Sequence, residues 1–366
     1  MAFGFFKKKK KEKKSDSRYQ TLTIREVVNI AEEAVNLVFE KPEGPFSYQP
    51  GQFITIIEEV ESKKVRRAYS LCTTPFIDEF PAVTVKRVPG GIMSNYLNDS
   101  VKAGDQLEIM EPMGMFTTDY SDASSRHVVF LGGGSGITPL YSILRSILLK
   151  EPNSKVSLVY GNRTEGHIIF KEALAKLKET HGDRFELVHI LEDNNGFAQH
   201  SGRPTAESMR DIIDGLGVDG DTEFFICGPE PMMDIASEGL QLLGIQNEKI
   251  RKESFDAGKT SPAVVVDDSK ASTDGLKSEV TIVLDGEEHV IEVDGDTPIL
   301  DAGLDAELDM PYSCQSGLCT ACRAKCLEGE VDQEDAHGIS QSEMDEGYVL
   351  LCVGKPKSPR IKVEVG

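Results

Sequence analysis

The sequence lacks any long uninterrupted apolar run. No stretch approaches the ~20 residues that a membrane-spanning helix needs, and the most apolar stretches carry Gly, Arg or Lys at short intervals. An export signal is also absent, because the phenylalanines of residues 3–6 precede the lysine run of residues 7–11, the reverse of the secretory order. We therefore expect a cytoplasmic protein that does not span a membrane.

Cysteine is scarce, with seven in 366 residues, and the odd number does not fit a complete set of disulfides. In the cytoplasm, thiols stay reduced or bind metal. The chain also has little positive charge, with a formal net charge of -21. This acidity argues against nucleic-acid binding, because phosphate contacts need a basic face.

Positive charge is concentrated in residues 1–18, which hold eight Lys or Arg against two acids, a net of +6 that leaves -27 for the rest. We interpret this segment as a disordered, solubilising basic tail. The alternative is weak docking of its aromatic and lysine side chains on anionic lipid or on an acidic partner, peripheral to a membrane.

The length favours two or three domains. From residue 19 to about 116, short β-type runs alternate with turns, which predicts an antiparallel β-barrel domain over residues 19–122. The expected strands cover 21–28, 35–40, 52–57, 82–88 and 106–110.

From about His127 the pattern changes to strands that alternate with helices, which predicts a doubly wound parallel sheet over residues 123–257. The expected strands are 127–131, 156–160, 185–191 and 223–227. The helices expected in this domain follow Pro139 and cover about 166–180, 204–213 and 230–243. Residues 258–277 are small, polar and charged, which indicates a linker, and a separate module of residues 278–366 should follow it.

The strongest chemical signal is Cys314, Cys319 and Cys322 in C-x4-C-x2-C spacing, with Cys352 thirty residues later. This is the plant-type [2Fe-2S] arrangement. The alternative is a zinc site or a set of reduced core cysteines. Zinc usually takes two close Cys pairs, however, and only one such pair precedes Cys352.

Two segments of the barrel carry chemistry of another kind. Arg67-Ala68-Tyr69-Ser70 offers a guanidinium for a diphosphate, a ring for stacking and a hydroxyl for a ring nitrogen. On an unbent strand, residues 67 and 69 would face one side and residues 68 and 70 the other. Gly90-Gly91-Ile92-Met93-Ser94 then precedes a helical stretch and predicts a phosphate cradle.

Two further segments follow strands of the parallel sheet. The glycine-rich turn of residues 132–139 lets the backbone approach a pyrophosphate at a helix N-terminus, although it departs from the strict G-x-G-x-x-G pattern. Cys227-Gly228-Pro229-Glu230-Pro231-Met232 follows a later strand at the sheet edge where ligands bind. A ligand-free turn and an ordinary core thiol are the alternatives.

Residues 278–366 resemble the plant-type ferredoxin family, through the cysteine spacing, DTPILDAGLDAELDMPYSC and DEGYVLLCVGKP. The resemblance implies a β-grasp fold and transfer of single electrons. Residues 19 to about 257 resemble the ferredoxin-NADP reductase superfamily, through R-A-Y-S, G-G-I-M-S, G-G-G-S-G-I-T-P, Y-G-N-R and C-G-P-E-P-M in that order. It implies an FAD-binding barrel followed by an NAD(P)-binding domain.

The resemblance also implies which residues bind the cofactors. The FAD site would comprise Arg67, Ala68, Tyr69, Ser70, Gly91, Ile92, Met93, Ser94 and Phe255. The NAD(P)H site would comprise Gly132, Gly133, Gly134, Gly136, Thr138, Pro139, Arg163, Cys227, Gly228, Pro229 and Met232. The catalytic roles would belong to Ser70 near the flavin nitrogen, Cys227 beside the nicotinamide and Glu253 in proton movement.

The coenzyme preference stays open. Many NADP-selective relatives carry a Ser-Arg pair after the third strand of this domain, whereas this chain has Leu191-Glu192-Asp193. An acid at this point binds a ribose 2'-hydroxyl and repels a 2'-phosphate. Arg163 or Arg203 would be able to neutralise that phosphate, so NADH and NADPH both remain candidates.

As a whole, the chain resembles reductase subunits of multicomponent oxygenases, such as the phenylacetyl-CoA epoxygenase reductase type. We expect an enzyme that passes electrons from NAD(P)H through FAD and the [2Fe-2S] cluster to an oxygenase, hydroxylase or desaturase. The module of residues 278–366 has a net charge of -14 by residue count, which predicts a basic docking surface on that partner. The alternatives are a ferredoxin or flavodoxin reductase with an internal relay, and a non-catalytic carrier or scaffold.

Overall fold

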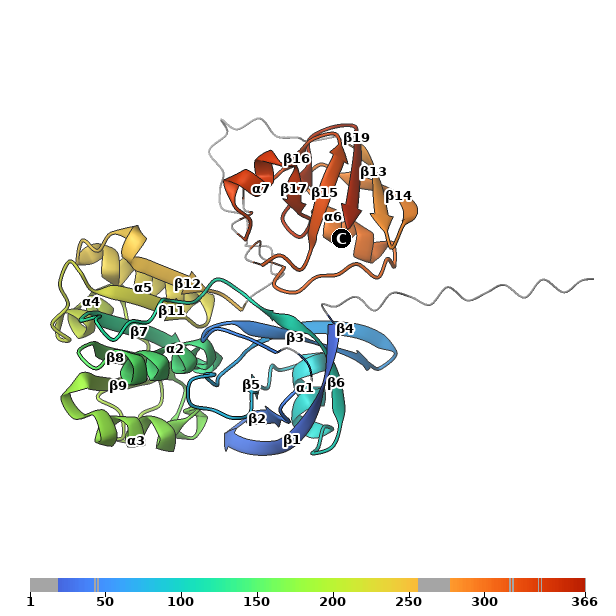
Figure 1. The fold of residues 1–366 in the computed structure, drawn as a ribbon. Helices are drawn as coiled ribbons and strands as arrows, with labels where there is room; N and C mark the ends of the chain where they lie inside the picture. The colour runs from blue at the N-terminus through green and yellow to red at the C-terminus, as the bar shows by residue number, and fades with distance from the viewer. Residues whose placement is uncertain are drawn as a thin grey trace, which may run out of the picture.

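The computed structural model describes residues 19–42, 44, 46–255, 277–315, 317, 319–334, 336 and 338–365. The basic tail of residues 1–18 and nearly all of the linker of residues 258–277 lie outside the described residues. Among the helices that are described, none has the length and apolar character to cross a bilayer. Three sheet-based regions follow one another along the chain (Figure 1).

The first region is an antiparallel sheet that curls into a barrel, as the sequence predicted. Its elements are β1 (Tyr19–Ala31), β2 (Ala34–Phe39), β3 (Phe53–Val60), β4 (Lys63–Ser70), β5 (Ala82–Lys86), α1 (Ile92–Asp99) and β6 (Gln106–Met113). The strand order is β4-β3-β6-β1-β2-β5, and a bridge between Leu71 and Val83 connects the two ends of the sheet. Along β2, Val35, Leu37 and Phe39 are buried while Asn36 and Val38 are more exposed, the alternation of a strand with one face in the core.

The second region is a parallel sheet in the order β10-β9-β8-β7-β11-β12, covered by helices on both faces. Its main elements are β7 (His127–Gly133), α2 (Ile137–Lys150), β8 (Lys155–Asn162), α3 (Lys171–His181), β9 (Phe185–Leu191), β10 (His200–Ser201), α4 (Ala206–Asp214), β11 (Glu223–Cys227), α5 (Glu230–Leu242) and β12 (Ile250–Glu253). The chain moves from β7 out to β9 and then returns to the other side of β7. Open parallel sheets bind ligands beyond the carboxyl ends of their strands at such a reversal, so the ends of β7 and β11 are the edge where a ligand is expected.

One predicted helix begins later than expected. The periodic pattern predicted a helix over residues 166–180, but α3 begins at Lys171, because Phe170 has a left-handed backbone (φ 62°) and a short 3-10 turn covers Glu165–His167. The Phe170 ring is buried and stacks on the Tyr141 ring, with centroids 4.3 Å apart. Tertiary packing therefore overrides the helical pattern of this segment.

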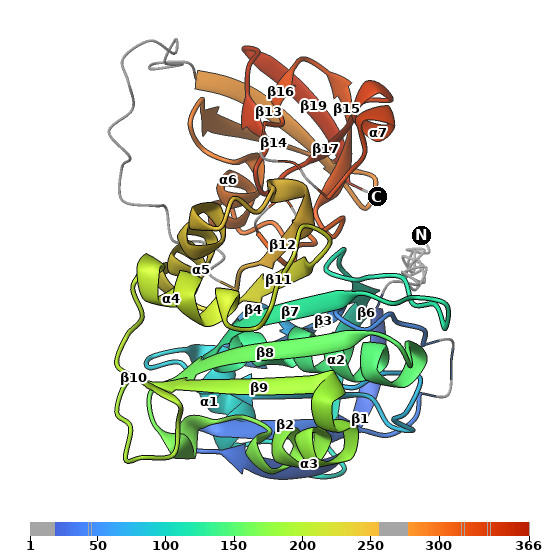
Figure 2. The ribbon, with the colours of Figure 1, turned by 90° about the vertical axis from the view of Figure 1, so that its left-hand side faces the viewer.

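The third region is a β-grasp fold, a mixed sheet in the order β14-β13-β19-β15-β17 that packs on a short helix. Its elements are β13 (Lys277–Leu284), β14 (Glu287–Asp294), α6 (Ile299–Asp305), β15 (Arg323–Glu328), β16 (Val331–Asp332), α7 (Gln341–Asp345), β17 (Tyr348–Leu350), β18 (Lys355–Pro356) and β19 (Arg360–Val365). Strands β13 and β19 are parallel, and the other pairs of this sheet are antiparallel. Figure 2 shows this region, in orange and red, beside β11, β12 and the barrel strands β3 and β4.

Candidate functional site

A pocket forms where the three regions meet. The barrel contributes the end of β4, the parallel sheet contributes the segment after β12, and the β-grasp region contributes the segment that begins the cysteine loop. The lining residues are Phe53, Arg67, Ala68, Ser70, Glu253, Ser254, Phe255, Ser313, Cys314 and Gln315. Residues predicted to bind a flavin therefore lie at the same pocket as the first predicted iron ligand.

The strand β4 does not keep a simple alternation where it ends. Arg67, Ala68 and Ser70 all line the pocket, whereas Tyr69 packs, half-buried, against the barrel core. The Ser70 side chain is buried, and its hydroxyl has no hydrogen-bond partner among the described residues. A buried hydroxyl without a partner fits a cofactor that supplies the missing acceptor or donor, such as a flavin ring nitrogen.

Glu253 is the buried carboxyl group of this pocket. It pairs in register with Cys227 on the neighbouring parallel strand, and its Oε2 lacks a hydrogen-bond partner in the described part of the chain. Burial, and then the neighbouring Cys314, raise the pKa of Glu253 to about 8. A carboxyl group with a pKa near neutrality can hold or release a proton at working pH.

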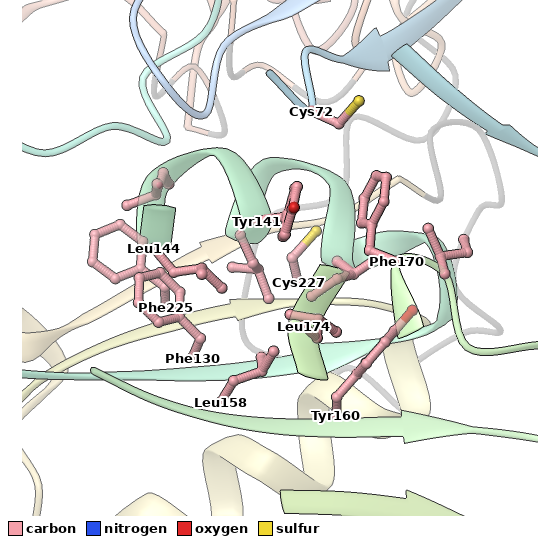
Figure 3. Packing of buried hydrophobic residues seen from close by; sticks show 14 of the residues in the cluster. Cys72, Phe130, Tyr141, Leu144, Leu158, Tyr160, Phe170, Leu174, Phe225 and Cys227 are labelled. Carbon is pink, nitrogen blue, oxygen red and sulfur yellow. The ribbon is translucent and has the colours of Figure 1, made fainter. Parts of the chain in front are cut away.

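Cys227 is fully buried beneath α2, as Figure 3 shows. Burial, with a smaller contribution from Glu253, raises the pKa of its thiol well above the usual range. A neutral thiol is a weak nucleophile. Cys227 belongs to the hydrophobic core, which is the environment of the core thiol that the sequence left as the alternative.

The two predicted nucleotide-binding segments touch each other through their glycines. A Cβ at Gly136 would lie 2.0 Å from the carbonyl oxygen of Cys227, and one at Gly228 would lie 2.9 Å from the backbone nitrogen of Gly133. A Cβ at Gly133 would lie 2.9 Å from Pro229 and 3.3 Å from the sulfur of Met232. Only glycine allows this close backbone approach at the start of α2, where Thr138 and Pro139 form the buried first turn.

The predicted phosphate cradle of the barrel lies at the start of α1. The Ser94 hydroxyl accepts a hydrogen bond from the Val88 amide (3.1 Å) and donates one to the Gly91 carbonyl (3.3 Å). Ile92 and Met93 form the first turn of the helix, and Met93 is buried. These bonds hold the turn closed. No described side chain caps the N-terminus of α1, so its first N–H groups are available to an anion.

Lys86 is a site residue that the sequence reasoning missed. It is the last residue of β5, and its Nζ lies 3.3 Å from the point where a Cβ of Gly134 would stand. Burial, and then the nearby Arg163, lower the pKa of Lys86. A barrel cation thus lies at the glycine turn of the other domain, and the only sequence signal for it was a lysine ending a strand just before the Gly90-Gly91 turn.

The two arginines that the sequence offered for a 2'-phosphate are both in ion pairs. Arg163 forms an ion pair with Glu33 (2.6 Å), and Arg203 forms one with Glu192 (3.0 Å). Both arginines are exposed, at 56% and 79% of the side chain. Arg163 and Arg203, which the sequence left open as phosphate ligands, therefore each already have a carboxylate partner.

The four predicted iron ligands come together in two environments. Cys322 and Cys352 belong to the hydrophobic core of the β-grasp region. Cys319 belongs to an apolar cluster that it shares with barrel residues such as Phe53 and Ile57, and Cys314 packs against that cluster. Neighbouring thiols and burial raise the pKa of Cys319, through Cys314, and of Cys352, through Cys314 and Cys322.

The raised pKa values of Cys319 and Cys352 disfavour their thiolate forms beside the neighbouring thiols unless cations lie between them, which fits a metal cluster. Within the described ranges, no three Cys, His, Asp or Glu side chains converge on one ion-sized point. A two-iron cluster held by four cysteines needs a pair of thiolates at each iron, so paired thiols are compatible with it. Gly317 bends the intervening loop with a left-handed backbone (φ 70°).

Three family descriptions match the chain, and each covers one region. The "Oxidoreductase FAD-binding domain" matches residues 21–118, the "Oxidoreductase NAD-binding domain" residues 130–238, and the "2Fe-2S iron-sulfur cluster binding domain" residues 282–357. The chain therefore has domains for all three predicted cofactors.

The chain is also similar to curated proteins over nearly its full length. It is 35% identical to the "3-ketosteroid-9-alpha-monooxygenase, ferredoxin reductase component" of Rhodococcus rhodochrous, over 95% of this chain and 97% of that protein. It is 33% identical to one of the subunits of 1,2-phenylacetyl-CoA epoxidase from Escherichia coli, over 94% and 97% of the two chains.

A solved structure supports the same fold. The crystal structure of phthalate dioxygenase reductase, a "modular structure for electron transfer from pyridine nucleotides to [2Fe-2S]", aligns over 95% of this chain and 98% of its own, with a TM-score of 0.57 and 22% identity. Together with the curated relatives, these matches confirm the resemblance that the motifs indicated. The chain belongs to the ferredoxin-NADP reductase superfamily, as an FAD- and NAD-binding oxidoreductase with a plant-type [2Fe-2S] domain at its C-terminal end.

Proposed function

We propose that this chain is the reductase component of a multicomponent oxygenase. It would take electrons from a reduced nicotinamide, pass them through FAD to its own [2Fe-2S] cluster, and deliver them singly to the oxygenase. The observation that carries the proposal is the shared pocket, in which Ser70, Glu253 and Cys314 lie together although they belong to three regions. The relatives support it, since they are named as components of a monooxygenase and of an epoxidase.

The flavin ring would lie in this pocket and link two-electron to one-electron chemistry. Ser70 would hydrogen-bond a ring nitrogen, because its buried hydroxyl lacks a partner within the described residues. Glu253 would hold the proton exchanged on reduction, and Phe255, which is 42% exposed at the pocket, would cover the ring. Arg67 and the start of α1 from Gly91 to Ser94 would bind the diphosphate.

The nicotinamide coenzyme would bind in the crevice between β7 and β11. Cys227 would lie beside its ring, and the close packing of Gly133, Gly136 and Gly228 would bring the backbone to the pyrophosphate. Lys86 would add a positive charge at the same turn. Because Lys86 belongs to the barrel, coenzyme binding would also hold the two domains together.

We infer that NADH is the preferred coenzyme. Both candidate cations for a 2'-phosphate, Arg163 and Arg203, already pair with Glu33 and Glu192. Asp193, next to Glu192, leaves this part of the crevice with more negative than positive charge. A 2'-phosphate would meet repulsion there, while a 2'-hydroxyl could donate a hydrogen bond to a carboxylate.

The test is anaerobic addition of NADH to the purified chain, followed by absorbance. We expect bleaching of the flavin and then loss of the cluster bands, with reduction of a one-electron protein acceptor afterwards. Flavin bleaching without any change in the cluster would contradict the proposed route. Bleaching of neither would point to a carrier or scaffold.

A further inference from the structure

The [2Fe-2S] domain is attached to the barrel by a charged contact outside the shared pocket. The Asp309 carboxylate accepts a hydrogen bond from Lys64 Nζ (2.6 Å) at one oxygen and from Arg66 Nη2 (2.8 Å) at the other. Lys64 and Arg66 both lie on β4 of the barrel, more than 240 residues away along the chain. We call these three residues the Asp309 clasp.

Arg66 is the unusual member of the clasp. Its side chain is only 4% exposed, and its Nη1 also donates to the Met310 carbonyl oxygen (3.1 Å). Its guanidinium lies 5.4 Å from the centroid of the Tyr312 ring. A buried guanidinium is costly unless it is paired. The [2Fe-2S] domain supplies acceptors for both Nη atoms of Arg66, while its Nε has no partner among the described residues.

Other contacts surround the clasp and lead towards the iron ligands. The hydroxyls of Thr55 and Ser313 share a hydrogen bond between β3 and the residue before Cys314. Cys319 and Ala321 pack with Phe53 and Ile57 in one apolar cluster. The interface therefore combines an ionic contact, a hydroxyl pair and an apolar patch, and the apolar patch includes an iron ligand.

The strand β4 connects this interface to the flavin pocket directly. Arg66 contacts the [2Fe-2S] domain, and the next residue, Arg67, lines the pocket. On the other side, only five positions separate Asp309 from Cys314, which lines the same pocket. A shift of Asp309 relative to β4 would therefore change the separation between the flavin pocket and the first two cysteines.

We propose that the Asp309 clasp positions the [2Fe-2S] domain for electron transfer from the flavin within the same chain. The inference rests on the proposed function, because it assigns positioning residues to the step from FAD to cluster. Lys64 and Arg66 bind no cofactor in this scheme. They hold the cysteine loop against β3 and β4, and so keep the distance between the two redox groups short.

A zero-length carbodiimide cross-link tests the contact without relying on activity. The reagent joins a carboxylate to an amine in direct contact, so it should couple Asp309 to Lys64 in the full-length holoprotein, detected by peptide mass spectrometry. The matched control is the Lys362–Glu288 pair inside the [2Fe-2S] domain, which is also short (2.7 Å) and has an equally exposed carboxylate. Coupling of the control pair alone would overturn the proposed docking.

Asp309→Asn tests the positioning role. We expect flavin reduction by NADH to be unchanged and cluster reduction by the flavin to slow about tenfold or more, because Arg66 loses its charged partner while it remains buried. Glu288→Gln removes a carboxylate of equal exposure from the far ion pair and should leave both rates unchanged.

The outcomes separate this inference from the proposed function. If the wild-type chain fails to reduce its cluster, the proposed function is wrong. If the wild-type chain reduces its cluster and Asp309→Asn does so at the same rate, with an intact cluster spectrum, the clasp does not position the domain. Equal slowing in Glu288→Gln would also overturn it, because any loss of charge would then have the same effect.

Discussion

The two ends of the proposed electron-input site differ in their contact with water. At the junction of the three regions, Ser70 and Glu253 are at most 8% exposed, and each has a polar atom without a partner among the described residues. At the outer rim, Arg163 and Arg203 are more than half exposed and paired with carboxylates. The junction therefore has polar atoms that a ligand could hydrogen-bond, whereas the charged groups at the rim are already paired with each other.

This difference sets the size of the effect that each residue can have. In a buried, low-dielectric junction, one polar group interacts strongly with a cofactor and is costly to leave unpaired. At an exposed rim, ion pairs contribute only about 0–1 kcal/mol, since solvent and salt screen them. Substitutions at the junction should therefore change chemical steps, and those at the rim should change only coenzyme preference.

The largest expected effect is at the cluster side of the junction. In Cys319→Ser, we expect flavin reduction by NADH to persist while reduction of a one-electron protein acceptor falls to background, because one of four iron ligands is lost. Stopped-flow absorbance of the flavin and a steady-state assay with cytochrome c measure the two steps. Continued reduction of cytochrome c at the wild-type rate would contradict the proposed route.

Cys322→Ser sharpens this test within the same cluster. Cys322 lies in the core of the [2Fe-2S] domain, whereas Cys319 lies in the apolar cluster shared with the barrel. Both variants should lose the iron-sulfur cluster. Loss of the cluster should lower the thermal stability of the [2Fe-2S] domain in both variants, as measured by circular dichroism. The fall should be larger for the Cys322 variant, whose side chain lies in the core of that domain.

The next effect in size is at Ser70. Ser70→Ala removes the one buried hydroxyl that lines the pocket from β4. We expect flavin reduction by NADH to slow about a hundredfold, because this loss is typical when one hydrogen-bond donor at a reacting centre is removed. Single-turnover kinetics under anaerobic conditions measure it. The control is Ser157→Ala, which removes a buried hydroxyl bonded to His127 far from the pocket. If both variants behave alike, the effect is on folding.

A third prediction concerns the pH dependence of the stability of the second region, through the buried side chain of His189. His189 on β9 is 5% exposed, its Nδ1 lacks a partner in the described ranges, and burial lowers its pKa from 6.5 to about 4. The unfolded chain thus binds a proton below about pH 6.5 that the folded domain does not bind. Stability should fall as the pH drops from 6.5 to 4, by up to about 3 kcal/mol.

Chemical denaturation at several pH values checks this expectation for wild type and His189→Gln. The variant should be less stable than wild type at pH 7, where neutral His189 fits its site beside Tyr160 and Phe197. It should lose less stability on acidification. An equal slope for both proteins would mean that His189 does not titrate as its burial implies.

The sequence predicted a strand well where the strand's own residues formed a recognisable apolar pattern. The predicted strands 185–191 and 223–227 coincide with β9 and β11, because short, mostly apolar runs rich in Phe, Val and Ile are typical of buried parallel strands. It did not predict β12, although Glu253 lies on it, since four residues of mixed character carry no periodic signal. A sequence pattern is local, whereas a short edge strand forms only because a neighbouring strand pairs with it.

Contacts between the three regions could not be predicted from the sequence, because they join residues that lie far apart along the chain. The motifs indicated Ser70, Glu253 and Cys314 separately, but nothing in their spacing tells that the three share a pocket. Lys86 was missed because its role depends on a glycine turn of another domain, about 48 positions later. The Asp309 clasp joins ordinary surface-type residues, which become distinctive only when Arg66 is seen to be buried.

The smallest effect is expected at the rim and concerns coenzyme choice. Glu192 pairs with Arg203 at exposed positions, so Glu192→Gln should free that guanidinium for a 2'-phosphate. We expect kcat/KM for NADPH relative to NADH to rise by about fivefold at most, which is equivalent to about 1 kcal/mol. Flavin reduction at saturating NADH should not change. Glu172→Gln, at an exposed position on α3, is the control. If flavin reduction by the Glu192 variant slowed at saturating NADH, the rim would take part in the chemical step. The rim and the junction would then not differ in the kind of effect that their residues have.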